Sequence, residues 1–266
     1  MPRRAVFFLP HPDDEFGVFG EFERLRKCDV ELHACFLTRS KSPNVQQRRM
    51  KESIRVLQYF GFETRNIHWI GLQLNVIDGS LHRFSAPLLT TCDQLLADFG
   101  RDCEIQLYVP AFEGGHQDHD AAHVIGTLAA LRAKQPLECF QFPLYNGAGL
   151  RHGLFRVLTP LRANGNCIIR RCSRARRAVH LAWCLTYTSQ WRSWIGLWPA
   201  ALIRWMSMPH SLVQEVEPRR VHERPHDGPL LYEERGFSSW TEVSAALNEI
   251  IATRVPAATT ASDVPQ

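Results

Sequence analysis

The chain has 266 residues, of which 45% are hydrophobic and 22% charged, and its formal net charge is +4. This composition excludes a disordered chain and a coiled coil, and the length allows a full hydrophobic core without disulfide bonds. The eight cysteines form no C-x-x-C pair, so we expect reduced thiols in a cytoplasm and neither a zinc ribbon nor a disulfide framework. The apolar run at 5–9 is too short for a signal peptide, and we expect none.

Strand-like and helix-like segments alternate along the first 145 residues. Short apolar runs predict buried strands, and helical periodicity ending at Gly61 and at Gly100 predicts helices. This order predicts an α/β fold with a parallel sheet, helices on both faces, and ligands bound beyond the carboxyl ends of the strands. In chain order the predicted elements are strand 5–9, helix 15–27, strand 30–37, helix 45–60, strand 66–70, helix 84–99, strand 104–109 and helix 118–133.

The pattern becomes less regular after residue 145. We expect residues 146–255 to be the C-terminal part of the same domain, forming a substrate pocket, a lid or a surface region, and residues 256–266 to be a disordered tail. Segment 181–208 is rich in Trp, but Arg192 and Arg204 interrupt it, so it cannot span a bilayer. Packed core is the favoured interpretation of this segment, with a membrane-surface helix and an active-site lid as alternatives.

Charge is unevenly distributed in the same part of the chain. Residues 139–214 contain many arginines and no Asp or Glu, and a stretch of one sign attracts anions. The arginines within 170–177 predict contact with a phosphate-bearing acceptor or an anionic membrane surface, unless they are merely solvated. We expect no nucleic acid partner, because neither an aromatic stacking platform nor a groove-reading motif accompanies them.

The first chemical cluster is His11-Pro12-Asp13-Asp14-Glu15, directly after the first predicted strand. Buried carboxylates are costly unless a cation or hydrogen bonds compensate them. Adjacent side chains diverge, so one of Asp13 and Asp14 can bind a metal while the other faces a water molecule. The alternative is an ordinary helix cap on a surface turn.

The second cluster, EGGHQDH at 113–119, follows the predicted strand that ends at residue 109. Gly114 and Gly115 allow the backbone to approach a ligand closely. Imidazoles are good zinc ligands, and two of them with one carboxylate leave a fourth position open for water. The alternative is a pair of surface histidines on a glycine turn. Because both clusters follow strands of one sheet, together they favour a metal-dependent hydrolase.

Further motifs strengthen a family resemblance. Together with the two clusters they resemble the zinc-dependent N-deacetylases of the LmbE/PIG-L family, which includes de-N-acetylases of N-acetylglucosaminyl-phosphatidylinositol and of sugar precursors of bacterial thiols and antibiotics. The resemblance covers residues 4–130 well and 180–190 loosely. It implies a Rossmann-like sheet with residues 1–145 as catalytic core, and Zn²⁺ as cofactor, with another divalent metal as the alternative. The additional motifs are Leu37-Thr38-Arg39, Arg49-Met50-Lys51-Glu52 followed by Phe60-Gly61, and Tyr187-Thr188-Ser189-Gln190.

The resemblance also implies roles for individual residues. The metal ligands would be His11, Asp14 and His119. Asp13 would be the general base that deprotonates the attacking water, and His116, protonated, would stabilise the oxyanion and supply a proton to the leaving amine.

Two further roles follow from the resemblance, and two positions depart from it. Asp118 would orient the imidazole of His116, and Arg49 would contact the substrate. Gln117 replaces the proline of the H-P-D-H pattern. Gly114 stands where some members carry Tyr, which leaves open whether one oxyanion donor is absent or comes from elsewhere.

The leading functional hypothesis is removal of the N-acetyl group from an N-acetylated amino sugar similar to N-acetylglucosamine, free or on a glycan, lipid or natural-product acceptor. One alternative is an amidohydrolase for a non-sugar acyl amide. Another is a catalytically silent protein that binds a glycan or an anionic membrane. The expected location is the cytoplasm, or the periphery of the inner membrane surface.

Overall fold

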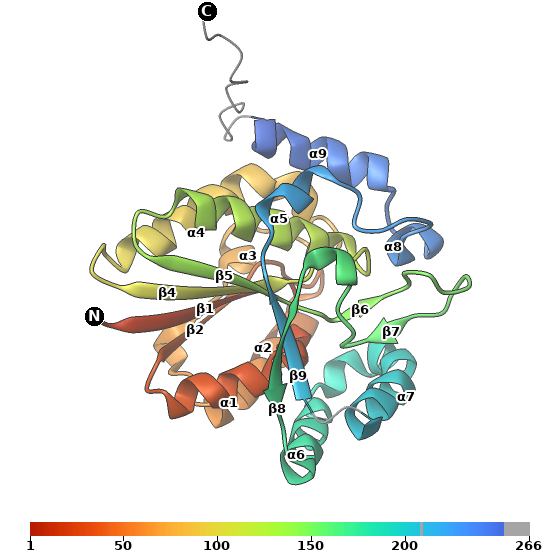
Figure 1. The fold of residues 1–266 in the computed structure, drawn as a ribbon, viewed down its shortest axis with the longest axis horizontal. Coiled ribbons are helices and arrows are strands. Elements are labelled where there is room, and N and C mark those ends of the chain that lie inside the picture. The colour runs from red at the N-terminus through yellow and green to blue at the C-terminus, as the bar shows by residue number, and fades with distance from the viewer. Residues whose placement is uncertain (208–209, 253–266) are drawn as a thin grey trace, which may run out of the picture.

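The computed structural model describes residues 1–207 and 210–252 (Figure 1). Its centre is a seven-stranded sheet with the strand order β3-β2-β1-β4-β5-β9-β8. Five neighbouring strands are parallel, while β9 is antiparallel to β5 and β8 is antiparallel to β9. The predicted mostly parallel α/β fold is confirmed. The strands are β1 (Arg3–Leu9), β2 (Glu31–Phe36), β3 (Ile67–His68), β4 (Glu104–Pro110), β5 (Leu137–Phe142), β8 (Cys167–Arg171) and β9 (His210–Glu215).

Helices cover both faces of this sheet (Figure 1). One face carries α1 (Phe19–Lys27), α2 (Pro43–Tyr59), α6 (Arg174–Cys184) and α7 (Trp191–Ser207), and the other carries α4 (Ser85–Asp98), α5 (Gln117–Arg132) and α9 (Trp240–Ala252). Shorter elements connect them. These are η1 (Asp14–Gly17), η2 (Thr64–Asn66), α3 (Ile70–Gln73), η3 (Leu81–Phe84), a hairpin of β6 (Tyr145–Asn146) and β7 (Arg156–Val157), η4 (Arg162–Asn164), η5 (Thr188–Gln190), η6 (Pro218–His222) and α8 (Leu231–Glu234).

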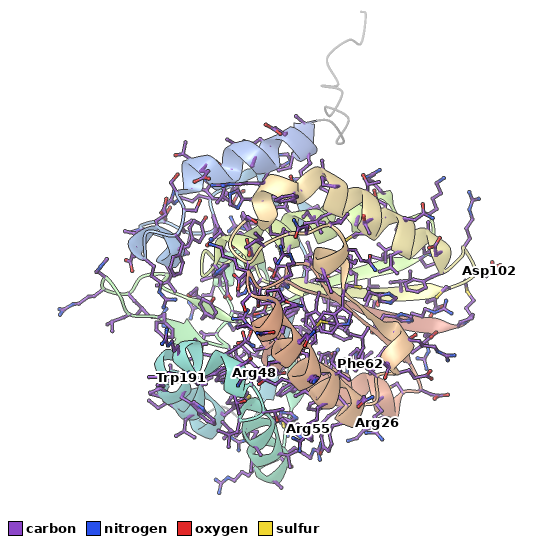
Figure 2. All side chains as sticks on the ribbon, turned by 180° about the vertical axis from the view of Figure 1, so that it is seen from behind. Arg26, Arg48, Arg55, Phe62, Asp102 and Trp191 are labelled. Carbon is purple, nitrogen blue, oxygen red and sulfur yellow. The ribbon has the colours of Figure 1, made fainter. Side chains whose placement is uncertain are left out.

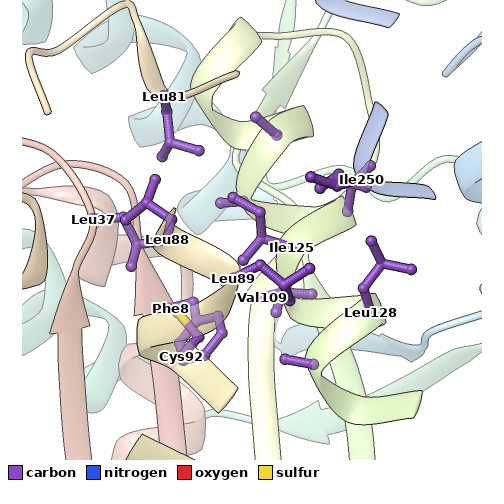
Figure 3. Packing of buried hydrophobic residues seen from close by; sticks show 14 of the residues in the cluster. Phe8, Leu37, Leu81, Leu88, Leu89, Cys92, Val109, Ile125, Leu128 and Ile250 are labelled. Atoms are coloured by element: carbon purple, nitrogen blue, oxygen red, sulfur yellow. The ribbon is translucent and has the colours of Figure 1, made fainter. Parts of the chain in front are cut away.

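The alternation of side chains along β1 supplies both halves of the core. Ala5, Phe7 and Leu9 pack toward α1 and α2, whereas Val6 and Phe8 pack toward α4 and α5, and all five are completely buried. Figure 3 shows the second half, in which Phe8 lies among aliphatic side chains of α4 and α5. A strand that is buried on both faces reads as a continuous apolar run, which explains the run at 5–9.

Strands from the C-terminal half extend the same sheet. Because β8 and β9 continue it beyond β5, residues on both sides of position 145 share one core. The division of the chain at residue 145 stays a prediction. The predicted tail, residues 256–266, lies outside the described residues.

Two predicted elements differ in detail. The helix expected at 15–27 is divided into η1 and α1, and the strand expected at 66–70 is only the two residues of β3. Strand β3 is short because α3 begins at Ile70 and brings Gly71 against the end of β2. A Cβ atom on Gly71 would lie 2.3 Å from the backbone of Leu37, so the chain turns away at a position that only glycine allows.

The Trp-rich segment forms α7 and part of the core. Trp194 and Trp205 are buried on the sheet side of this helix, as the packed-core interpretation requires. Among the described residues, none of the helices has the length and the hydropathy needed to cross a membrane.

Candidate functional site

The loop after β1 holds its carboxylates in a constrained backbone. Asp13 has φ 109° and ψ −20°, a region that non-glycine residues rarely adopt. The completely buried Glu15 accepts a hydrogen bond from the backbone N–H of Asp13 at 2.5 Å. Glu15 therefore stabilises this turn from inside the protein, a role that the sequence did not indicate.

Asp14 lies between two histidines from different strand ends. One carboxylate oxygen is 3.3 Å from Nδ1 of His11, and the other is 3.1 Å from Nε2 of His119 on α5. All three side chains are buried. The fold therefore brings together the three residues expected to bind metal, although they come from segments more than a hundred residues apart in sequence.

Asp118 contacts a different imidazole from the one expected. Its carboxylate accepts a hydrogen bond from Nε2–H of His11 at 3.0 Å and from the backbone N–H groups of Gly79 and Leu81 at 2.6 and 3.0 Å. His116 instead caps α5, because its Nδ1 accepts the backbone N–H of Asp118 at 3.1 Å. In the structure the Asp118 carboxylate therefore contacts the ring of His11, whereas the sequence suggested a contact with His116.

Asp78 joins the site from the loop after α3. Its carboxylate lies 3.3 Å from Nε2 of His11 and 3.2 Å from the guanidinium of Arg49. Arg49, on α2, is thereby fixed at the edge of the site. The sequence analysis did not place Asp78 in the site. Ile77 forms an isolated parallel bridge with Arg39 just beyond β2, and this tertiary contact brings Asp78 to the edge of the sheet.

The two adjacent aspartates have opposite pKa shifts. Burial, together with the charge of Asp14, raises the pKa of Asp13 well above its ordinary value. Burial acts on Asp14 in the same sense, but the imidazoles of His119 and His11 outweigh it and lower the pKa of Asp14. Burial and the charge of His11 lower the pKa of His116 to about 4. Paired carboxyls whose environments separate their pKa values are typical of acid–base sites.

The donor set suits a divalent cation such as zinc. Ligand atoms at about 2.0–2.1 Å from a tetrahedral zinc stand about 3.3 Å apart, close to the two separations that Asp14 makes with His11 and His119. The Nε2–H of His11 donates to a carboxylate, which leaves Nδ1 free to bind metal, as is usual for a metal-ligating histidine. Nδ1 of His116 accepts a backbone N–H at the helix cap, so the neutral ring carries its hydrogen on Nε2 and offers a hydrogen-bond donor there. Donor atoms of His11, His116 and His119 also lie within 4.8 Å of one another.

A cavity of about 530 Å³ opens above this cluster. Asp13, Asp14 and His116 line its floor, and most of its wall comes from residues after position 144, of which only Gln190 and Arg192 were singled out from the sequence. The wall is mixed in character, with aromatic and aliphatic groups beside two arginines. These wall residues are Tyr145, Phe155, Gln190, Arg192, Gly196, Leu197, Arg235 and Phe237.

Residues 187–190 contact two of the earlier motifs, the one at 49–52 on α2 and the first cluster at 11–15. The Ser189 backbone N–H and the Thr188 hydroxyl each donate to Glu52 of α2 at 2.9 Å. The Gln190 amide donates to the backbone carbonyl of Pro12 in the first cluster. The segments that carry the family resemblance are therefore in contact around the cavity.

The glycine pair of the second cluster serves the protein backbone. A Cβ atom on Gly115 would lie 2.0 Å from the backbone oxygen of Tyr145, so Gly115 allows β6 to pass over the loop. The ring of Tyr145 then packs edge-on against His119, with ring centroids 5.3 Å apart. From the sequence we expected the glycines to let the backbone approach a ligand closely. In the structure Gly115 instead lets the backbone of β6 approach the loop.

The arginines at 170–177 are largely used within the protein. Arg170 is 3.4 Å from Glu21, Arg176 pairs with Glu23, and the buried Arg177 donates to the backbone carbonyl of Trp205. Of this group, only Arg171 and Arg174 are exposed without such a contact.

Comparison with known families agrees with the motifs. Residues 6–130 match the family model PIG-L, GlcNAc-PI de-N-acetylase. The resemblance to the PIG-L (LmbE-like) family is confirmed for this part of the chain. No curated protein matches the sequence.

Solved structures share the fold across most of the chain. The conserved protein TT1542 from Thermus thermophilus is 22% identical, with a TM-score of 0.51, over 80% of this chain and 94% of that one. N,N'-diacetylchitobiose deacetylase from Pyrococcus horikoshii is 12% identical, with a TM-score of 0.56, over 84% and 87%. A deacetylase of teicoplanin biosynthesis is 14% identical, with a TM-score of 0.54, over 81% and 98%. The fold therefore extends beyond the family match into the C-terminal half.

Proposed function

We propose that this protein is a zinc-dependent hydrolase that removes the N-acetyl group from an N-acetylated amino sugar resembling N-acetylglucosamine. The observation that carries the proposal is the position of Asp14 between His11 and His119, on the floor of a cavity also lined by Asp13 and His116. The family model is named for a GlcNAc-PI de-N-acetylase, and one structural neighbour is a deacetylase of N,N'-diacetylchitobiose. Both names support an amino-sugar amide as substrate.

In this proposal His11, Asp14 and His119 hold the metal ion, and Asp118 fixes the ring of His11. When bound, the ion supplies Lewis acidity that polarises the scissile carbonyl and acidifies water. Asp13 takes the proton of the attacking water, because it lines the cavity beside the ligands without being one of them.

His116 stabilises the developing oxyanion by donating a hydrogen bond. Because its Nδ1 accepts the N–H of Asp118, the neutral ring carries its hydrogen on Nε2. It can therefore donate to the carbonyl oxygen without an additional proton, which differs from the protonated form that the family resemblance implied. The proton that Asp13 has taken up is then available to the departing amine.

Arg49 and the cavity wall bind the rest of the substrate. Arg49 is held by Asp78 at the cavity edge, and its guanidinium suits sugar hydroxyls or an anionic substituent. The exposed Arg171 and Arg174 are the members of the 170–177 group left to meet a phosphate-bearing acceptor. The cytoplasmic location expected from the sequence stays a prediction.

A non-sugar acyl amide is the second candidate substrate, and the observation that favours it is the apolar part of the wall, formed by Phe155, Leu197 and Phe237. The deciding experiment is to incubate the zinc-loaded protein with N-acetylhexosamine glycosides, nucleotide sugars and N-acetyl amino acids while acetate release is followed. Acetate from the amino sugars supports the proposal, and acetate from the amino acids alone supports the second candidate. Release from none of them would contradict both and favour a silent binding protein.

A further inference from the structure

Helix α7 carries large apolar side chains on two opposite sides, which is unusual for a helix at the surface of a protein. Its inner side, which includes Trp194, Ala201 and Trp205, is buried in the core. The opposite side, which we call the outer face of α7, is equally apolar. It consists of Trp191, Arg192, Ile195, Pro199, Leu202 and Ile203.

The outer face exposes large hydrophobic side chains to solvent. Ile195 is 62% exposed, Ile203 67% and Trp191 55%. Trp191, at the start of α7, lies toward the left side of the molecule in Figure 2. Contiguous exposed apolar surface of this kind marks a protein or membrane contact, because leaving it in water is unfavourable.

The charges around α7 indicate which partner it fits. The elements packed against it, α6, η5 and β7, contain no Asp or Glu. The single charged residue of the outer face is Arg192, whose guanidinium stacks on the ring of Trp191 at 5.6 Å. An apolar helix face with Trp at its edge and Arg192 as its single charged residue is complementary to an anionic lipid surface, where Trp and Arg sit at the headgroup level.

We propose that the outer face of α7 docks on the surface of an anionic lipid bilayer. The helix lies in the interface with Trp191, Ile195, Leu202 and Ile203 inserted among the lipids and Arg192 at the headgroups. The helix would lie on the membrane surface without crossing the bilayer. This agrees with the absence, among the described residues, of a helix long and apolar enough to cross it.

Docking in this orientation would place the catalytic cavity beside the membrane. Arg192, Gly196 and Leu197 line that cavity, so the outer face of α7 continues into its rim. The β6–β7 hairpin projects on the same side of the molecule as α7 (Figures 1 and 2), and Leu154 in its loop is 56% exposed. From the sequence, a membrane-surface helix was an alternative for segment 181–208, and the arginines of 170–177 suggested a second membrane contact.

The test is sedimentation of the full-length protein with vesicles of phosphatidylcholine alone and of phosphatidylcholine mixed with phosphatidylglycerol. We expect binding to the mixed vesicles and much weaker binding to the neutral ones. The double variant Ile195→Ser/Ile203→Ser should weaken binding at least about tenfold, since two buried aliphatic side chains are lost from the lipid contact. Arg192→Glu should weaken binding to the mixed vesicles only.

The matched control is Leu72→Ser/Leu131→Ser, which removes exposed aliphatic side chains from α3 and α5 and should leave vesicle binding unchanged. Circular dichroism establishes that each variant is folded, and deacetylation of a small soluble substrate should be unaffected by the serine variants. The proposal is overturned if the wild type binds neither vesicle, or if the Ile195/Ile203 variant binds like the wild type. It is also overturned if light scattering shows a dimer that this variant dissociates, without any vesicle binding.

Discussion

At the residue scale, the chemistry depends on two neighbouring aspartates in different environments. Asp14 is flanked by two imidazoles that lower its pKa, so it is an anionic ligand. Asp13 is held by Glu15 in a strained turn, faces the cavity, and has a pKa raised by burial. Sequence adjacency makes this division possible, because successive side chains leave the backbone in different directions.

Asp13→Asn should abolish turnover and preserve the metal. The amide keeps the size of the carboxylate but cannot accept the proton of the attacking water, so we expect kcat to fall by about 10²–10⁴-fold. Metal content by elemental analysis should equal that of the wild type. Loss of metal together with activity would mean that Asp13, and not Asp14, is the ligand.

Asp118→Asn should weaken metal binding without removing a metal ligand. The Asp118 carboxylate accepts the Nε2–H of His11 and two backbone N–H groups, and an amide has only one oxygen to offer them. We expect the zinc dissociation constant to rise about 10–100-fold, measured by competition with a chromophoric chelator. Unchanged affinity would show that His11 is oriented by Asp78 alone.

At the scale of elements, the site is assembled where β6 crosses the loop before α5. Gly115→Ala would place a methyl group against the backbone oxygen of Tyr145, which cannot move without displacing the hairpin. We expect a loss of about 1–3 kcal/mol in the free energy of unfolding and reduced activity, measured by urea titration and acetate release.

Gly196→Ala is the matched control for this substitution. Gly196 lies within α7, and a Cβ atom there has no neighbour within 4 Å. Alanine should therefore stabilise the protein by up to about 1 kcal/mol, because it favours the helix. Equal stability of the two alanine variants would contradict the crowding at Gly115.

At the scale of the whole molecule, the sequence predicts the helices, the strands and the motifs. It does not predict which distant residues the fold brings into the site. The strands and helices of the first 133 residues are found because apolar periodicity and glycine stops are local signals. The two clusters also fall at neighbouring strand ends, as expected for a parallel sheet. Asp78 and Tyr145 were missed because each reaches the site through a loop whose course depends on tertiary packing. For the segment that forms α7, the sequence left packed core and a membrane-surface helix as alternatives, since its composition does not distinguish a buried side from an exposed one.

The response of the whole fold to acid depends on buried histidines far from each other. Burial lowers the pKa of His123 on α5 and of His180 on α6 to about 4 each. Both rings are neutral in the folded protein, where His123 donates to the backbone carbonyl of Pro110 and His180 to the carboxylate of Glu23. An unfolded chain binds these protons at its ordinary pKa of about 6.5.

The free energy of unfolding should therefore decrease as the pH is lowered from about 6.5 to about 4. In this window the unfolded state binds protons that the folded state does not. Each histidine contributes at most about 3 kcal/mol to this loss. Urea unfolding followed by Trp fluorescence, in the presence of a chelator so that metal binding adds no pH dependence, should show a shallower loss for His123→Gln/His180→Gln than for the wild type. Carboxyl groups other than Glu23, which contacts His180, have the same surroundings in both proteins, so the difference between the two slopes reports on the two histidines and on Glu23. Parallel slopes would mean that both rings take up protons in the folded state, with Glu23 stabilising the charged form of His180.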